Sequence, residues 1–208
     1  MKVKSYFYSS LLIISFVFLQ GKLSAQNNSK TESLFGDGSV LNTNDLGFFI
    51  APAYGITQMD GSNVSIFNLR GGVNFKDKVS IGGYFNTSIN DIKPESENLP
   101  NIYMDYWSVG GFAEYTLLAK KLVHLTFPLY MGYGEVQIDN EIGDVGLGEA
   151  NFFQIEPSAL LEINLHKNVR FNLGAGYRIV GQMNYRNFDQ SDLSGFTGYA
   201  GLKFGLFR

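Results

Sequence analysis

The sequence predicts an all-β fold, an eight-stranded antiparallel up-and-down transmembrane β-barrel. Three observations lead to this prediction. The chain holds 24 glycines and 15% aromatic residues but only 17% charged residues, a composition typical of strands and tight corners. Apolar and polar residues alternate with a period of two from about residue 46 onward, which indicates strands with one apolar face. Short and long connections between these strands also alternate.

The alternating runs define the strands in chain order. We expect strands at about 46–57, 64–75, 79–89, 103–115, 122–136, 152–165, 169–180 and 196–207. These runs are much longer than the usual strand of about 5–6 residues. They are long enough for a tilted strand to cross a bilayer, which takes about 9–11 residues.

The connections predict which ends of the strands lie together. Short connections are expected at 76–78, 116–121 and 166–168, and longer polar ones at 58–63, 90–102, 137–151 and 181–195. Short turns at one rim and long loops at the other are typical of outer-membrane barrels. A soluble sandwich would mix the two lengths.

The N-terminal residues are predicted to lie outside the barrel. Lys2 and Lys4 precede an apolar run that ends at Leu19, and small residues follow up to Ala25. This run is shorter than the roughly 20 residues that a helix needs to span a membrane, and it is typical of a secretory signal peptide. The alternative is an uncleaved N-terminal anchor helix. We therefore expect a signal peptide at 1–25, a flexible periplasmic leader at 26–45 and the barrel at 46–208.

The polar face of the strands carries the candidate site. In a membrane barrel the apolar face contacts lipid and the polar face lines the lumen. The predicted lumen charge network consists of Arg70, Glu114, His124, Glu156, Glu162, Arg170, Arg178 and Lys203. A tight turn at 166–168 would place Glu156 opposite Arg178 and Glu162 diagonal to Arg170. The network is interpreted either as a gated or selective pore or as a structural plug, because eight strands leave room only for side chains.

The sequence indicates no catalytic residue, no metal site and no cofactor. Cysteine is absent, and only His124 and His166 could supply imidazole chemistry. The acidic residues of 137–151 lack the spacing of a calcium loop. Without residues 1–25 the chain would keep 19 acidic residues and lose three of its 16 basic ones, which argues against nucleic acid as a partner.

Three prolines interrupt the predicted strands. Pro52, Pro128 and Pro157 each lack the amide hydrogen that a strand ladder uses. A closed barrel has no edge strand to accommodate them. We therefore expect bulges or other irregularities at these positions.

The last strand carries a recognisable pattern of Tyr199, Gly201, Phe204 and Leu206. With it, the chain resembles the small eight-stranded outer-membrane β-barrel proteins of Gram-negative bacteria, in the porin-like superfamily. It also resembles an uncharacterised subgroup with "FFQIEPSALLEINLHKNVRFNLGAGYRIV" and "SDLSG…LKFG" endings. Such barrels commonly end on Phe, whereas Arg208 follows Phe207 here.

The resemblance implies the fold and a place in the cell outer membrane. It further implies contact with outer-membrane lipid, insertion by the barrel-assembly machinery and a monomeric state. It implies no catalytic residue, because one fold supports many activities. The expected function is non-enzymatic, either structural or in interaction with a small solute or ligand. The alternatives are a lipid-modifying barrel enzyme and a soluble periplasmic barrel that binds an apolar ligand.

Overall fold

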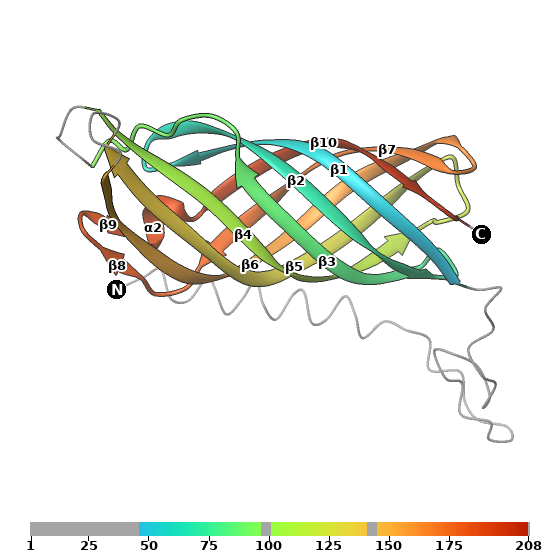
Figure 1. Cartoon of the computed structure of the whole chain (residues 1–208). Helices are drawn as coiled ribbons and strands as arrows, with labels where there is room; N and C mark the ends of the chain where they lie inside the picture. Colours follow the sequence, from blue (N-terminus) through green and yellow to red (C-terminus); the bar gives the residue numbers. More distant parts are fainter. Residues whose placement is uncertain (1–45, 97–100, 141–144, 208) are drawn as a thin grey trace, which may run out of the picture. The chain divides into compact units, whose positions relative to one another are not determined.

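A computed structural model describes residues 46–96, 101–140 and 145–207, and these residues form a closed barrel of eight strands (Figure 1). The strands are β1 Leu46–Met59, β2 Ser62–Phe75, β3 Val79–Ser88, β4 Ile102–Leu117, β5 Val123–Asn140, β6 Val145–His166, β7 Val169–Val180 and β10 Gly195–Gly205. Each strand pairs with its neighbours antiparallel, and β10 closes the barrel on β1. The predicted fold class is confirmed. The predicted signal peptide and leader lie outside the described residues.

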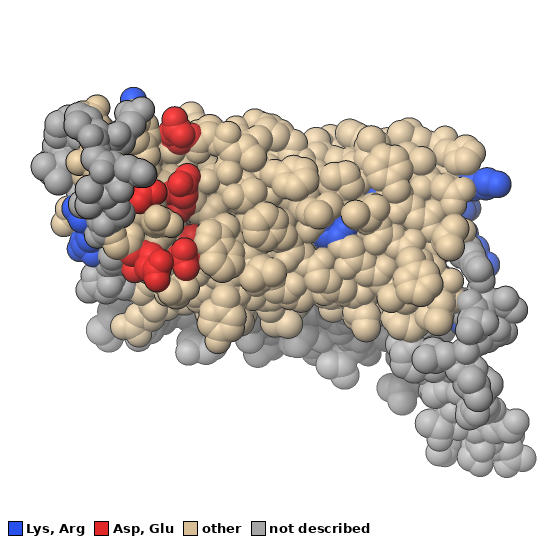
Figure 2. Space-filling model, in the orientation of Figure 1, with Lys and Arg blue, Asp and Glu red and all other residues tan. Residues whose placement is uncertain are grey.

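The alternation of β5 shows the polarity of the wall. The side chains of Val123, Leu125, Phe127, Leu129, Met131 and Tyr133 are 39–67% exposed on the outside. His124 and Thr126, between them in sequence, are buried on the inside. Most of the visible wall in Figure 2 carries no charge. A charged interior behind an apolar exterior is the arrangement of a membrane-spanning barrel, so the soluble alternative is wrong.

The polarity of the alternation reverses near one end of the barrel. In β5, Glu135, Gln137 and Asp139 lie on the outside, whereas Val136 and Ile138 are buried. Acidic residues gather on the exterior at the end that carries the long connections (Figure 2). Polar groups on the outside require water, so the reversal marks the level at which the wall leaves the lipid. The strands therefore continue beyond the bilayer at the end opposite the short turns.

This extension corrects two predicted connections. Residues 137–151 were expected to form a polar loop, but β5 continues to Asn140 and β6 begins at Val145. Glu141 and Asp144 of that segment lie outside the described residues. The predicted loop 58–63 is a two-residue turn at Asp60 and Gly61, both with positive φ, which suits a tight hairpin. The number of residues needed to cross the lipid underestimates the length of these strands. Their outer parts continue beyond the lipid, where apolar packing inside the barrel stabilises them.

The prolines leave gaps in the ladders without shifting the register. Pairing of β1 with β10 stops after Ile50 and resumes at Ala53 with the same register, so Pro52 faces a gap. The same occurs at Pro128 between β5 and β6 and at Pro157 between β6 and β7. The predicted irregularities are confirmed as gaps and not as bulges. The register shifts lie elsewhere, after Ile138 and after Asn164.

The connection between β7 and β10 folds over the barrel end that carries the long connections (Figure 1). It contains a small hairpin, β8 Asn184–Tyr185 and β9 Phe188–Asp189, and the short helix α2 Gln190–Leu193. Asp189 caps the helix, and its carboxylate accepts a hydrogen bond from the Ser191 amide at 2.7 Å. The described residues contain no helix that is long and apolar enough to span a membrane.

The cap gives α2 a predictable pH dependence. Hydrogen bonds from the Ser191 hydroxyl and amide hold the pKa of the Asp189 carboxyl below its usual range. A lowered pKa in the folded state means that the cap stabilises α2 above the pKa of the unfolded state and is lost as pH falls through the folded value. We expect the Asp189 carboxyl to titrate at a lower pH than in an unfolded peptide, measured by NMR. A midpoint at or above the peptide value would contradict the capping geometry.

Candidate functional site: the charged lumen

The lumen near the short turns holds a network of charged side chains from six strands or turns. Arg70 comes from β2, Glu114 from β4, His124 from β5, Glu162 from β6, and Lys203 from β10. Each is at most 2% exposed. Arg170 of β7 joins them at 5% exposure. Six of the eight predicted lumen residues therefore lie together, because inward positions of the barrel wall converge on one narrow axis.

Glu114 and Glu162 are the centres of this network. Lys203 Nζ lies 2.7 Å from Glu114 Oε1 and 2.6 Å from Glu162 Oε1, so one ammonium group bridges both carboxylates. Arg70 bridges the same pair, with Nη1 3.0 Å from Glu114 and Nη2 3.6 Å from Glu162. The contacts of Arg70 and Lys203 with Glu114 are charge-assisted hydrogen bonds, which are among the strong ones of a protein interior, whereas their contacts with Glu162 are ion pairs.

Glu162 has two further partners. His124 Nε2 lies 3.1 Å from Glu162 Oε2, and Arg170 Nη1 lies 3.8 Å from the same oxygen. Arg170 also contacts Asp77 at 3.4 Å and packs over the ring of Phe207. Three cationic residues therefore face three carboxylates. Buried charges are tolerated only when they are paired in this way.

Sequence reasoning missed Asp77, Tyr130 and Ser80 in this network. Asp77 lies in the short turn 76–78 and was interpreted as a turn residue only. Arg70 Nη1 donates to the Tyr130 hydroxyl at 2.9 Å, and the Ser80 hydroxyl donates to Glu114 at 3.4 Å. Tyr130 and Ser80 occupy inward positions of the alternation, which is the one sequence signal that could have found them.

Glu156 and Arg178 lie apart from this network. The register of β6 and β7 places them opposite each other, since Ile155 pairs with Ile179 and Ser158 with Gly176. Among the described contacts, however, no ion pair joins them. Glu156 instead accepts a hydrogen bond of 2.7 Å from the Tyr199 hydroxyl. The expected ion pair is therefore not formed among the described residues, and Arg178 donates instead to the Leu193 carbonyl oxygen and to the Thr57 hydroxyl.

Polar and aromatic side chains fill the lumen between these groups. Gln154 Nε2 donates to the hydroxyls of Tyr84 and Ser108, and Gln154 Oε1 accepts from Tyr106. Phe49, Ala51, Tyr84, Phe112 and Tyr130 form a buried cluster. The hydroxyl-bearing residues bridge this cluster to the apolar end of the barrel.

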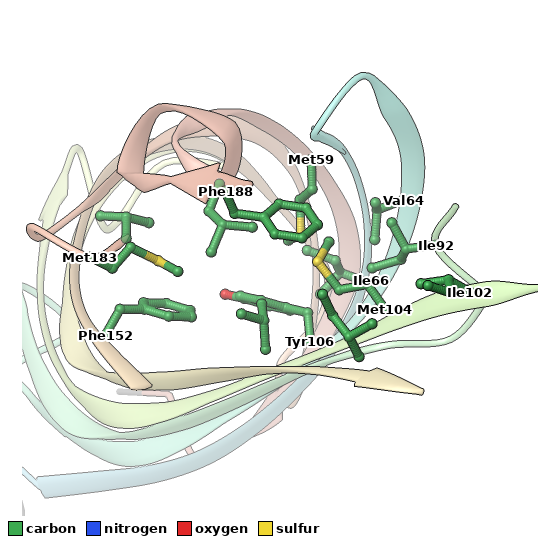
Figure 3. Close-up of a cluster of buried hydrophobic side chains, with 14 residues drawn as sticks. Met59, Val64, Ile66, Ile92, Ile102, Met104, Tyr106, Phe152, Met183 and Phe188 are labelled. Atoms are coloured by element: carbon green, nitrogen blue, oxygen red, sulfur yellow. The ribbon is translucent and has the colours of Figure 1, made fainter. Parts of the chain in front are cut away.

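The barrel end that carries the long connections is filled by apolar side chains. The cluster consists of Met59, Val64, Ile66, Ile92, Ile102, Met104, Tyr106, Val136, Ile138, Phe152, Val180, Met183, Phe188 and Leu193. Figure 3 shows Met183 and Phe188 from the connecting segment facing Met59, Phe152 and Tyr106 of the wall. This apolar cluster was not predicted, because it requires the outer extension of the strands.

The described residues offer no group that could hold a metal ion, by the criterion of three or more clustered His, Cys, Asp or Glu side chains. His124 is 1% exposed and bound to Glu162 and to the Lys121 carbonyl oxygen. His166 is exposed at the end of β6, where its Nδ1 accepts from the Asn168 amide. Neither histidine has a serine among its hydrogen-bond partners.

Comparison with known proteins identifies the fold. No protein-family model matches the sequence, and no curated protein does. The structure is similar to Neisserial surface protein A, NspA, with 11% identity and a TM-score of 0.55 over 79% of this chain and 97% of that one. At lower TM-scores of 0.46 it is similar to Ail of Yersinia pestis and to the outer membrane protein OprG of Pseudomonas aeruginosa. Ail is 21% identical over 77% of this chain and 97% of its own, and OprG 9% identical over 79% and 97%.

The likeness to NspA concerns the fold, which is that of small outer-membrane barrels. The apolar exterior and charged interior give the membrane location independently. The predicted resemblance to small eight-stranded outer-membrane barrels and the predicted outer-membrane location are thereby confirmed.

Proposed function

We propose that the chain is a non-enzymatic, monomeric outer-membrane barrel with a sealed lumen, inserted by the barrel-assembly machinery, whose role is structural or in interaction with a small solute or ligand. The bridging of Glu114 and Glu162 by both Arg70 and Lys203 carries this proposal. Four side chains from four strands meet across the axis of the barrel. A conducted ion would have to break several charge-assisted contacts at once.

Two further layers support a plug over a pore. The aromatic cluster around Tyr84 and Tyr130 lies beside the charged network, joined to it by the Arg70–Tyr130 hydrogen bond. The apolar cluster fills the opposite end. An apolar constriction excludes ions because it offers them no replacement for their hydration shell. The structural interpretation of the lumen charges is therefore favoured over a selective pore.

The proposal that the barrel is not an enzyme rests on where the side chains of His124 and Glu162 point. A lipid-modifying enzyme needs a base, a nucleophile and an orienting carboxylate within reach of a lipid substrate. His124 faces the lumen behind the wall, and its carboxylate partner Glu162 is fully committed to Lys203, Arg70 and Arg170. The described lipid-facing residues offer no comparable group.

Reconstitution into planar bilayers tests the sealed lumen. We expect no single-channel steps with the purified full chain at salt concentrations where a porin control conducts. Stable unitary currents would contradict the plug. Lipids extracted from the same preparation should keep their masses, whereas a new lipid species that depends on the protein would favour the enzymatic alternative.

A further inference from the structure

The short-turn end of the barrel carries exposed basic side chains. The described turns at 76–78, 118–122 and 167–168 expose Lys76, Lys78, Lys120, Lys121 and Lys167. Among these turn residues the one acidic side chain is Asp77, which is buried and lies 3.4 Å from Arg170. The acidic residues of the exterior gather at the opposite end, as Figure 2 shows. The exposed charge of the short-turn end is therefore positive.

Hydrogen bonds fix each of these turns to a strand of the next hairpin. The Thr116 amide of β4 donates to the Lys78 carbonyl oxygen at 2.7 Å. The Asn164 side chain of β6 donates to the Lys121 carbonyl oxygen at 3.0 Å. The Asn168 side chain donates to a carbonyl oxygen of β10 at 2.7 Å. The turns therefore form one continuous rim, and their lysines are displayed from a fixed backbone.

Exposed leucines lie among these lysines. Leu118 and Leu122 are 65% and 66% exposed in the turn that holds Lys120 and Lys121, and Leu165 is 61% exposed beside the next turn. Leu118 also has a φ of 58°, a left-handed conformation that favours glycine or asparagine. Apolar side chains next to lysines are typical of a surface that meets a bilayer, where leucine reaches the acyl chains and the ammonium group stays among the headgroups.

The height of the apolar wall gives the level of this rim in the membrane. The outward side chains of β5 are apolar from Val123 to Tyr133, and Glu135 is the next outward residue. At about 3.3 Å per residue and a tilt of about 40°, this stretch spans roughly 25 Å, which is the height of the lipid-facing band of outer-membrane barrels. Lys121 and Leu122 directly precede Val123, so they lie at the level of the lipid headgroups.

We propose that this short-turn rim binds the headgroups of anionic phospholipids in the periplasmic leaflet. The rim consists of Lys76, Lys78, Leu118, Lys120, Lys121, Leu122, Leu165 and Lys167. Its lysines contact the phosphates and its leucines pack on the acyl chains. The charge favours an anionic headgroup over a zwitterionic one, because each lysine near an anionic membrane surface adds attraction. The leucines favour a lipid over a soluble polyanion, which would leave them in water.

This proposal concerns the outside of the barrel at its periplasmic end. It therefore goes beyond the sealed lumen and does not depend on it. A conducting barrel could bind the same headgroups, and a sealed one could lack them, so the two proposals are tested separately.

Native mass spectrometry of the purified full chain measures this binding. Phosphatidylglycerol is the anionic probe and phosphatidylethanolamine the zwitterionic one. The triple variant Lys120→Gln/Lys121→Gln/Lys167→Gln removes three exposed charges and keeps the backbone contacts of the turns. We expect its Kd for phosphatidylglycerol to rise by about fivefold or more, since a single lysine near an anionic surface contributes about that factor. Its Kd for phosphatidylethanolamine should stay the same.

Two controls separate the charge of the rim from other effects. The variant Lys120→Arg/Lys121→Arg/Lys167→Arg keeps all three charges and should bind phosphatidylglycerol as the native chain does. Lys93→Gln removes a lysine at the opposite end of the barrel and should also leave this binding unchanged. The electrophoretic mobility of unheated samples shows that each variant is folded.

Three results would overturn the proposal. One is an unchanged affinity of the triple glutamine variant for phosphatidylglycerol. Another is an equal loss of affinity in Lys93→Gln, which would mean that the binding does not depend on the rim. The third is lysine-dependent binding of soluble muropeptides without a preference for phosphatidylglycerol, which would assign the rim to the cell wall instead.

Discussion

Replacing Glu162 by alanine is expected to lower the free energy of unfolding by about 3–5 kcal/mol. Glu162 contacts Lys203, Arg70, His124 and Arg170 inside the lumen. Its removal would leave three cationic residues facing Glu114 and Asp77 alone, in a space that water does not reach. A buried charge without a counterion costs far more than the net gain of the original pair.

Thermal or urea unfolding in detergent, followed by the shift of electrophoretic mobility that accompanies barrel unfolding, measures this loss. Glu149→Ala is the matched control, since Glu149 is an exposed carboxylate in the same strand. The control should stay within about 0.5 kcal/mol of the native chain. Equal stability of Glu162→Ala and Glu149→Ala would show that the network does not stabilise the barrel.

Replacing Gly82 by alanine is expected to lower stability by about 3 kcal/mol or to prevent folding, because overpacking next to rigid backbone cannot be relieved. A methyl group at Gly82 would lie 2.1 Å from the Gly71 carbonyl oxygen and 2.7 Å from Gly72 Cα. Both contacts are backbone atoms of β2, which is fixed by its ladder to β1 and β3.

The neighbouring Gly83 gives the control for this prediction. It faces outward, and a methyl group there would lie 3.6 Å from the Gly110 carbonyl oxygen, an ordinary contact. Gly83→Ala should therefore fold with a stability within about 0.5 kcal/mol of the native chain. Refolding yield and the unfolding midpoint in urea compare the two variants directly. Equal behaviour would mean that the lumen-side glycine is not required for close approach of the strands.

Several features of this barrel could be derived from the alternation alone. The period of two places His124 and Thr126 on one face of the strand and Leu125 and Phe127 on the other. Because the polar face carries charged residues that suit a lumen, the apolar face could be assigned to the lipid. The pattern of the last strand likewise predicts that Phe204 faces outward and Lys203 inward, as observed at 40% and 2% exposure. Local periodicity suffices here, because each side chain has only two directions along a strand.

The contacts between the lumen charges could be identified only from the structure of the closed barrel. The pairing of adjacent strands correctly predicted that Glu162 lies near Arg170. It could not identify Lys203 and Arg70, which contact Glu162 across the axis of the barrel. It also paired Glu156 with Arg178, which instead donates to the Leu193 carbonyl oxygen. Residues 181–195 and the part of the apolar cluster that lies in 58–63, 90–102 and 137–151 were predicted to be polar loops, because a transmembrane strand need not continue past the lipid.

The sequence by itself thus determined the class of barrel, the number of strands and the face that each residue occupies, since these depend on contacts along one strand or between adjacent strands. Only the tertiary structure decided which charges meet, where the apolar exterior ends and what covers the barrel end. Those features depend on the curvature that closes β10 onto β1 and brings inward side chains of distant strands within a few ångströms.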